Sequence, residues 1–266
     1  MMARFNMTYA WLLLLSGAMS TALPSRAARV GTLSPDGRVE AVIADSAGLA
    51  LSVNFDGRCI LDSSPLGIYY DGADNRAHFG ISDAGEPVTA RVTYHTDKGK
   101  RSHVDRMIVR RCLDVSPHFR LHLVVADDGV AYAYEHVGEY KTVIGENSGF
   151  TFPAGTQAWL TQLAKGKSFW AETNPSYEDH YNGPVDINHE SDSRQGWVYP
   201  ALFRTPAGDY ALVTETGLTG TYVATHLSEG RDNTLMVEMP MADQGHRYES
   251  IYPSVAGGSI LSLIHI

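Results

Sequence analysis

Turn-forming residues return about every ten residues along this chain and separate short apolar runs. Asp56-Gly57 lies between two such runs and is a strong hairpin signal, and Asp127-Asp128-Gly129 has the same character. A further turn is expected at 45–48. Beyond residue 27 no segment sustains the apolar spacing of a long helix. The pattern predicts an all-β chain that folds as a large antiparallel β-sandwich, supersandwich-like, with few short helices.

The expected strands show alternating or continuous apolar residues between these turns. They cover residues 38–43, 49–53, 59–61, 91–94, 105–109, 119–125, 130–135, 210–214 and 234–238. The sequence contains no internal repeat, low-complexity linker or sharp change in composition. We therefore expect one β-sandwich domain over residues 28–259.

The first residues look like an export signal. Arg4 precedes an apolar core at 10–19, and small residues at 20–22 and 25–27 fit a cleavage site. A membrane anchor is the alternative, but the apolar run is shorter than the ~20 residues that span a bilayer. We expect a signal peptide at 1–27, an exported protein that is periplasmic or secreted, and no membrane span after cleavage.

Composition narrows the range of partners. The chain is 44% hydrophobic and carries a net charge of −9, with a pI near 5.6. Nucleic acid and anionic membranes are recognised by clustered Lys and Arg, so the acidic balance argues against both. A neutral substrate or a bound cation fits better.

The two cysteines, Cys59 and Cys112, each lie in a strand-like run. Export would permit a disulfide, but two free thiols fit equally well. His118 and His122 are four residues apart, yet the alternation around them indicates a strand. We interpret both histidines as polar-face residues rather than zinc ligands.

The last residues, 260–266, form an apolar end without a charged tail. Leu261–Ile266 resembles one reading frame of an adapter used to prepare sequencing libraries. We hypothesise that 260–266 is a non-native tail and that the gene is cut here. An ordinary final strand is the alternative.

The stretch from Phe150 to Tyr222 concentrates aromatic rings and carboxylates between short strands. Rings cover the apolar faces of a sugar, and carboxylates bind hydroxyls or calcium. The acidic residues of this loop region are Glu172, Glu178, Asp179, Asp186, Glu190 and Asp192. Their spacing is not that of an EF-hand, so a solvated acidic loop remains open, as does a core role for the aromatic residues.

The sequence candidates for sugar contact are Trp159, Tyr177, Tyr181 and Glu215. Glu215 ends an apolar strand, where a carboxylate faces either a pocket or solvent. No nucleophile elbow, phosphate loop or dinucleotide fingerprint occurs. A convincing pair of carboxylates for glycoside hydrolysis is also missing, so no catalytic residue is predicted.

Several short segments together resemble the N-terminal domain of glycoside hydrolase family 97, which contains bacterial α-glucosidases and α-galactosidases. They are 33–37, 64–67, 127–135, Ala158-Trp159, Tyr177-Glu178 with Tyr181, and 211–215 with Leu218 and Tyr222. The resemblance extends over roughly Val30 to Ser254.

The resemblance implies a sandwich that precedes a catalytic (β/α)₈ barrel and a C-terminal β domain. The catalytic acids would lie on that barrel, and the substrate would carry a terminal α-glucosyl or α-galactosyl group. Calcium would be held mostly by barrel glutamates, with one ligand from the N-terminal domain at the position of Glu178. The fragment would then be inactive alone. A free-standing carbohydrate-binding module is the rival interpretation, and a β domain that binds another protein is a third.

Overall fold

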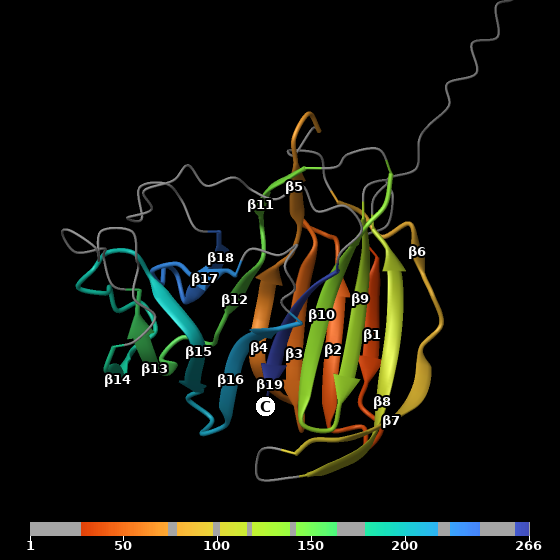
Figure 1. The fold of residues 1–266 in the computed structure, drawn as a ribbon, viewed down its shortest axis with the longest axis horizontal. Coiled ribbons are helices and arrows are strands. Elements are labelled where there is room, and N and C mark those ends of the chain that lie inside the picture. Colours follow the sequence, from red (N-terminus) through yellow and green to blue (C-terminus); the bar gives the residue numbers. More distant parts are fainter. Residues whose placement is uncertain are drawn as a thin grey trace, which may run out of the picture.

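A computed structural model describes residues 28–73, 79–97, 102–115, 119–138, 142–163, 179–217 and 224–239, together with the backbone of 259–265. The expected signal peptide lies outside the described residues. The described part is built from strands and turns and contains no helix, so the few short helices expected are not found there. No described helix could cross a bilayer. The all-β antiparallel architecture predicted from the sequence is confirmed (Figure 1).

The smaller sheet is a four-stranded antiparallel meander in the order β1-β2-β3-β4 among the described residues. Its strands are β1 (Arg29–Leu33), β2 (Val39–Ala44), β3 (Ala50–Phe55) and β4 (Arg58–Pro65). Three predicted runs, 38–43, 49–53 and 59–61, are confirmed as β2, β3 and β4. Their ends agree within one or two residues, except that β4 continues to Pro65.

The larger sheet has 13 strands among the described residues, with a main path β12-β18-β17-β15-β16-β19-β10-β9-β8-β6. Strand β7 pairs with β8, and β13 pairs with β14 and β15. Its N-terminal half contains β6 (Asp83–Ala84), β7 (Val88–His95), β8 (His103–Asp114), β9 (Phe119–Ala126), β10 (Gly129–His136) and β12 (Gly149–Thr151). Its C-terminal half contains β13 (Gln157–Gln162), β14 (Tyr181–Asp186), β15 (Trp197–Arg204), β16 (Tyr210–Thr216), β17 (His226–Leu227), β18 (Thr234–Glu238) and β19 (Ser259–His265). A separate ribbon joins β5 (Ile68–Tyr70) to β11 (Val143–Glu146).

The hairpins form where the sequence places its turns. Asp56 and Gly57 connect β3 to β4, and both have positive φ, 49° and 75°. Two successive positive φ values are the requirement of a type I′ turn, which Asp-Gly meets well. Asp127 and Asp128 connect β9 to β10, with Ala126 opposite Gly129. These turns fix the register and thus decide which side chains face the core.

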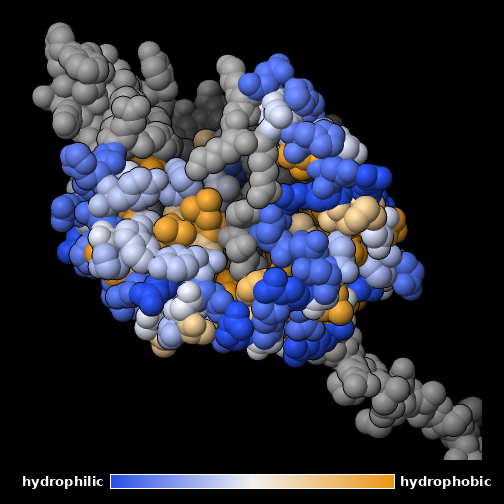
Figure 2. Space-filling view, turned by 90° about the horizontal axis from the view of Figure 1, so that it is seen from below, coloured by the Kyte–Doolittle hydropathy of each residue, from blue (hydrophilic) through white to orange (hydrophobic). Residues whose placement is uncertain are grey.

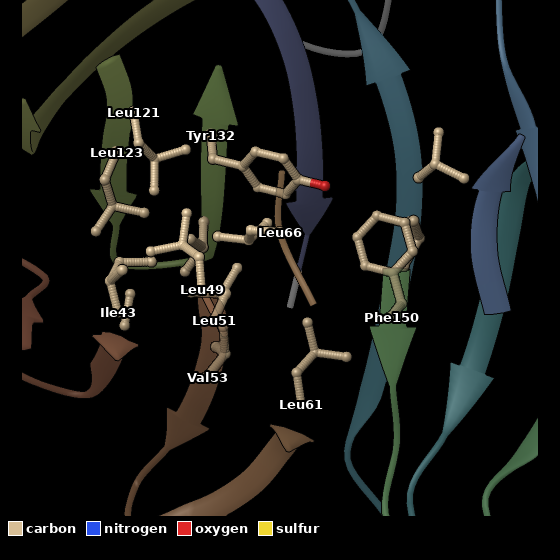
Figure 3. Close-up of a cluster of buried hydrophobic side chains, with 14 of the residues drawn as sticks. Ile43, Leu49, Leu51, Val53, Leu61, Leu66, Leu121, Leu123, Tyr132 and Phe150 are labelled. Carbon is tan, nitrogen blue, oxygen red and sulfur yellow. The ribbon is translucent and has the colours of Figure 1, made fainter. Parts of the chain in front are cut away.

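The two sheets pack face to face. β2 lies against β9 and β10, β1 lies against β8, and β12 lies against β4. Figure 3 shows the apolar side chains between the layers. They include Ile43, Leu49, Leu51, Val53, Leu61, Leu66, Leu121, Leu123, Tyr132 and Phe150, all buried. Alternation along β9 is strict: its odd-numbered residues from Phe119 to Val125 are buried, and Arg120 between them is exposed.

The surface seen from below in Figure 2 is mainly hydrophilic, with isolated apolar patches. Exposed large apolar side chains are scattered over several strands rather than gathered on one. They are Leu33, Val88, Tyr94, Met107, Ile144, Tyr181 and Tyr210. Such scattered residues are ordinary for a folded domain.

The segment Ser259–His265 forms β19 and inserts between β10 and β16, antiparallel to both (Figure 1). An apolar run can pair with an exposed strand edge whatever its origin, because the ladder uses backbone groups. The position of β19 therefore agrees with a natural final strand and with a substitute for one. The hypothesis of a non-native tail at 260–266 stays a prediction.

We expect Leu51→Ala to lower the free energy of unfolding by about 2–5 kcal/mol, because it leaves a cavity between the sheets. Leu51 is 1% exposed, whereas Leu33 on β1 is 53% exposed. Leu33→Ala is therefore the matched control and should change stability by less than about 1 kcal/mol. Urea unfolding of both variants measures the difference, and equal losses would contradict this core.

We expect Gly57→Ala to cost about 1–2 kcal/mol, because alanine is strained in the left-handed region. A Cβ at Gly57 would meet no atom within 4 Å, so the effect is conformational and not steric. Gly31 on β1 has no positive φ, and its added Cβ would meet only Glu40 Oε1 at 3.8 Å. Gly31→Ala should therefore be close to neutral in the same thermal unfolding assay.

Candidate functional site

The residues predicted to contact sugar come from three different strands. Trp159 lies on β13, Tyr181 begins β14, and Glu215 is near the end of β16. The other two, Tyr177 and the predicted metal ligand Glu178, lie outside the described residues. The fold and register show which of the first three can act together.

Trp159 forms a partly exposed aromatic surface with Tyr210. Their ring centroids are 6.1 Å apart with an interplanar angle of 33°, and Tyr210 is 51% exposed. The guanidinium of Arg204 lies 6.0 Å from the Tyr210 ring. We call Trp159, Tyr210 and Arg204 the aromatic surface. Such a surface can stack on the apolar face of a sugar ring, with Arg204 near its hydroxyls.

The backbone of β14 approaches Trp159 closely at Gly183. A Cβ added to Gly183 would lie 2.7 Å from Trp159 Cδ1 and 2.7 Å from the carbonyl oxygen of Ala158. A side chain at position 183 would clash at that distance, so Gly183 permits the close approach of β14 to Trp159. Tyr181, two residues before Gly183, is 58% exposed.

Glu215 lies on the opposite face of the sheet from the aromatic surface. Trp159 is paired with Leu202, which is paired with Leu212, so these three side chains share a face. Glu215 is three residues beyond Leu212 and therefore points to the other side. The register thus separates Trp159 and Glu215, which the sequence alone had grouped.

The Glu215 carboxylate is hydrogen-bonded to the segment that precedes β17. It accepts hydrogen bonds from the Thr225 backbone nitrogen at 3.1 and 3.2 Å and from Thr225 Oγ1 at 2.8 Å. Burial raises the pKa of Glu215, and the Thr225 hydrogen bonds oppose the rise. These hydrogen bonds link the end of β16 to the segment that precedes β17.

Glu146, at the end of β11, is a buried acid that sequence reasoning missed. Both of its carboxylate oxygens are buried, and neither has a well-formed hydrogen bond. Burial raises the pKa of Glu146 to about 7, and nearby Ser148 opposes the rise only in part. The Ser148 hydroxyl is itself bonded to Tyr134 at 2.6 Å. Burial also raises the pKa of neighbouring Tyr199 well above its usual value.

Glu146 opens onto a groove of about 1120 Å³ between the β5–β11 ribbon and the β17–β18 hairpin. Three further acids, Glu229, Asp232 and Glu238, line the groove. Glu229 accepts bonds from the Ser191 backbone at 2.8 Å and from the Gly196 backbone at 3.1 Å, and so holds the loop before β15. The charged lining of the groove consists of four acids and two arginines, Arg194 and Arg231, so acids predominate there.

The described acids of the predicted calcium loop do not converge on one point. Asp179 accepts a bond from Gln162 at 2.8 Å, Asp186 accepts one from the Asn188 backbone at 2.8 Å, and Glu190 pairs with Arg194. Within the described ranges, the grouped side chains that could hold a metal ion comprise one cysteine, one histidine and one glutamate. That set does not suit calcium, which takes oxygen ligands. The described residues therefore contain no complete calcium site.

The two cysteines are both free thiols and lie in different sheets. Cys59 is on β4 and exposed, and Cys112 is on β8 and partly buried. The open question of a disulfide is thus answered in this structure by two unpaired thiols. His122 lies on β9, as the alternation predicted, while its companion His118 lies outside the described residues.

Comparison with known proteins agrees with the fold. A family model described as "Glycosyl-hydrolase 97 N-terminal" matches residues 33–253. A "Probable retaining alpha-galactosidase" from Streptomyces bingchenggensis (strain BCW-1) is 35% identical over 188 residues, 69% of this chain and 27% of that protein. The chain thus spans about a quarter of the length of the curated relative it matches.

Two solved structures share the fold at low sequence identity. The crystal structure of a beta-arabinopyranosidase has a TM-score of 0.77 at 24% identity and covers 89% of this chain and 40% of that one. A Glycoside Hydrolase Family 97 enzyme from Pseudoalteromonas sp. strain K8, in complex with panose, has a TM-score of 0.71 at 17% identity, covering 89% and 35%.

The fold and these matches define the class of the protein, a β-sandwich domain of the kind found in glycoside hydrolases. The chain belongs to glycoside hydrolase family 97, and its matched region is the N-terminal domain of that family. The resemblance predicted from short segments between Val30 and Ser254 is confirmed, with nearly the same limits.

The raised pKa of Glu146 predicts a pH-dependent stability. The folded chain keeps the Glu146 proton up to about pH 7, whereas the usual value is 4.5. The contribution of the protonated Glu146 to the free energy of unfolding is therefore fully present below about pH 4.5 and is lost as pH rises through 7. The loss attributable to this group is about 3 kcal/mol.

Glu146→Gln removes the titrating group and keeps the shape of the side chain. In urea unfolding, the free energy of unfolding of this variant minus that of wild type should increase by about 3 kcal/mol between pH 4.5 and 8. Glu86→Gln, at an exposed position, is the matched control and should follow the wild-type pH profile. A difference between wild type and Glu146→Gln that does not change with pH would contradict the burial of Glu146.

Proposed function

We propose that this chain is the N-terminal, pocket-supporting domain of an exported, calcium-dependent, exo-acting α-glycoside hydrolase, and that it is inactive alone. The match of the family model to residues 33–253 carries the proposal. The sandwich would pack against the catalytic barrel and form one side of its substrate pocket. Its rigid two-layer core suits that supporting role, since a site is held best by packed elements.

The proposed substrate is a carbohydrate with a terminal α-galactosyl or α-glucosyl group. The 35% identical relative is named as an alpha-galactosidase, and a structural neighbour is a family 97 enzyme bound to panose. Because the chain spans 27% of that relative, the hydrolysis itself is assigned to the rest of the protein.

Calcium is proposed to be shared between this domain and the barrel through Glu178. One carboxylate cannot hold calcium, which takes about six to eight oxygen ligands. Three described acids near this loop, Asp179, Asp186 and Glu190, are already bonded within the domain. This supports a complete site only when the barrel supplies further glutamates.

Export to the periplasm or the medium is proposed from residues 1–27. Their basic start, apolar core and small-residue cleavage positions support a signal peptide. Mass spectrometry of the mature N-terminus of the exported protein would test this.

We expect the purified chain to show no turnover of an aryl α-galactoside or an aryl α-glucoside, with or without calcium. Extending the gene beyond Ser259 by amplification from the source DNA should reveal a frame that continues into a barrel, and the extended protein should be active. A frame that encodes 260–266 and then stops, or clear turnover by this chain alone, would contradict the proposal.

In the extended protein, Glu178→Gln should weaken calcium binding and lower activity at limiting calcium, and excess calcium should restore part of the activity. Asp179→Asn, one residue away and bonded to Gln162, is the matched control and should behave like wild type. Equal calcium dependence in both variants would remove Glu178 from the metal site.

The alternative, a carbohydrate-binding module, is favoured by the aromatic surface of Trp159, Tyr210 and Arg204. In that case the chain alone should bind galactose- or glucose-containing oligosaccharides in calorimetry. Binding should fall in Tyr210→Ala and persist in Tyr94→Ala, which removes an equally exposed tyrosine on β7. No heat of binding with wild type would exclude the module.

A further inference from the structure

Three side chains with metal-binding atoms meet on the outer face of the large sheet. Cys112 comes from β8, His122 from β9 and Glu135 from β10, and their sulfur, ring nitrogen and carboxylate oxygen all lie within 4.8 Å of one another. His122 Nε2 is 2.6 Å from Glu135 Oε2. This group lies outside the aromatic surface and the acidic groove.

The sheet ladder itself brings the three together. Cys112 is directly opposite His122, and His122 is directly opposite Ala133. Glu135 is two residues from Ala133 and therefore shares that face. The residues that alternate with them face the core: Leu113, Leu121 and Tyr134. Three paired strands give the cluster a rigid frame, which metal sites require.

We propose that Cys112, His122 and Glu135 bind a zinc-type divalent cation with one open coordination position. Thiolate, imidazole and carboxylate are all zinc ligands, whereas calcium and magnesium do not select sulfur. Zinc bonds of about 2.0–2.3 Å in a tetrahedron place neighbouring ligand atoms about 3.3–3.6 Å apart. The observed separations reach that arrangement by small side-chain movements. His122 and Glu135 are each about 40% exposed, 41% and 42%, so water can reach the fourth position.

The charges around the cluster are compatible with a bound cation. Arg120 is a base that acts on Cys112, but its Nε is bonded to Asp114 at 2.8 Å and its Nη1 is 3.6 Å from Glu135 Oε1. Asp83, on the neighbouring strand β6, adds a further negative charge close enough to act on Cys112. Among the charged groups that act on Cys112, the acids Asp83, Asp114 and Glu135 outnumber Arg120.

The cysteine separates this proposal from an ordinary ion pair. A hydrogen bond between His122 and Glu135 satisfies both groups without Cys112, whereas a metal ion would be bound by all three. A spectroscopic signal from the thiolate is therefore the decisive readout.

The test is a titration of the purified, reduced chain with Co²⁺, followed by absorption. We expect one equivalent to bind with a thiolate-to-cobalt charge-transfer band, and Zn²⁺ to displace it. Cys112→Ser should abolish the band, and Cys59→Ser, which removes the other free thiol, should leave it unchanged. His122→Gln and Glu135→Gln change partly exposed groups and should each weaken binding by at least about tenfold.

Zinc should also raise the melting temperature of wild type and of Cys59→Ser but not that of Cys112→Ser. If Cys112→Ser fails to fold, the His122→Gln and Glu135→Gln titrations decide the result. Three outcomes overturn the proposal: no thiolate band up to millimolar cobalt, a band that depends on Cys59, or equal cobalt affinity in wild type and both glutamine variants.

Discussion

The structure depends on the burial of two apolar sheet faces against each other. Neither sheet can stand alone, because each has a face of Val, Ile, Leu and aromatic side chains that water would otherwise contact. Strand β10 shows the constraint most clearly. It is buried from Gly129 to Tyr134, since it lies between β9 and β19 in its own sheet and against β2 of the other layer. Short turns fix the pairing, and a slip of one residue would turn the apolar set outward.

Once the core is fixed, the two faces of the large sheet acquire different chemistry. The inner side holds Glu215 near the end of β16, and Glu146 on the β5–β11 ribbon lies close enough to act on it electrostatically; burial raises the pKa of both acids. Thr225 hydrogen-bonds to the Glu215 carboxylate, whereas neither carboxylate oxygen of Glu146 has a well-formed hydrogen bond, and burial raises the pKa of Glu146 to about 7. The outer side holds the aromatic surface over β13 to β16 and the Cys112 cluster over β8 to β10. One sheet thus presents separate polar and aromatic regions without any helix among the described residues.

Much of the fold could be predicted because its signals are local. Asp56-Gly57 gives its turn through backbone preferences of two adjacent residues, and alternation along β9 reports its buried face directly. The candidate site was less accessible. Trp159 and Glu215 were grouped because both lie in one loop-rich stretch, but their strand positions place them on opposite faces. Tyr210 was overlooked as an ordinary strand residue, and Glu146 carries no sequence sign of being buried.

The sequence by itself determined the all-β class, the positions of the turns and the membership of a glycoside hydrolase family. The reason is that hydrophobic periodicity, turn residues and short motifs depend on residues that are close together in the chain. Only the tertiary structure decided which side chains meet. Cys112, His122 and Glu135 lie on three strands, and their contact follows from register across two ladders. Likewise the raised pKa of Glu146 arises from burial by segments remote in the sequence. Contact and burial are properties of packing between strands, and no local pattern encodes them.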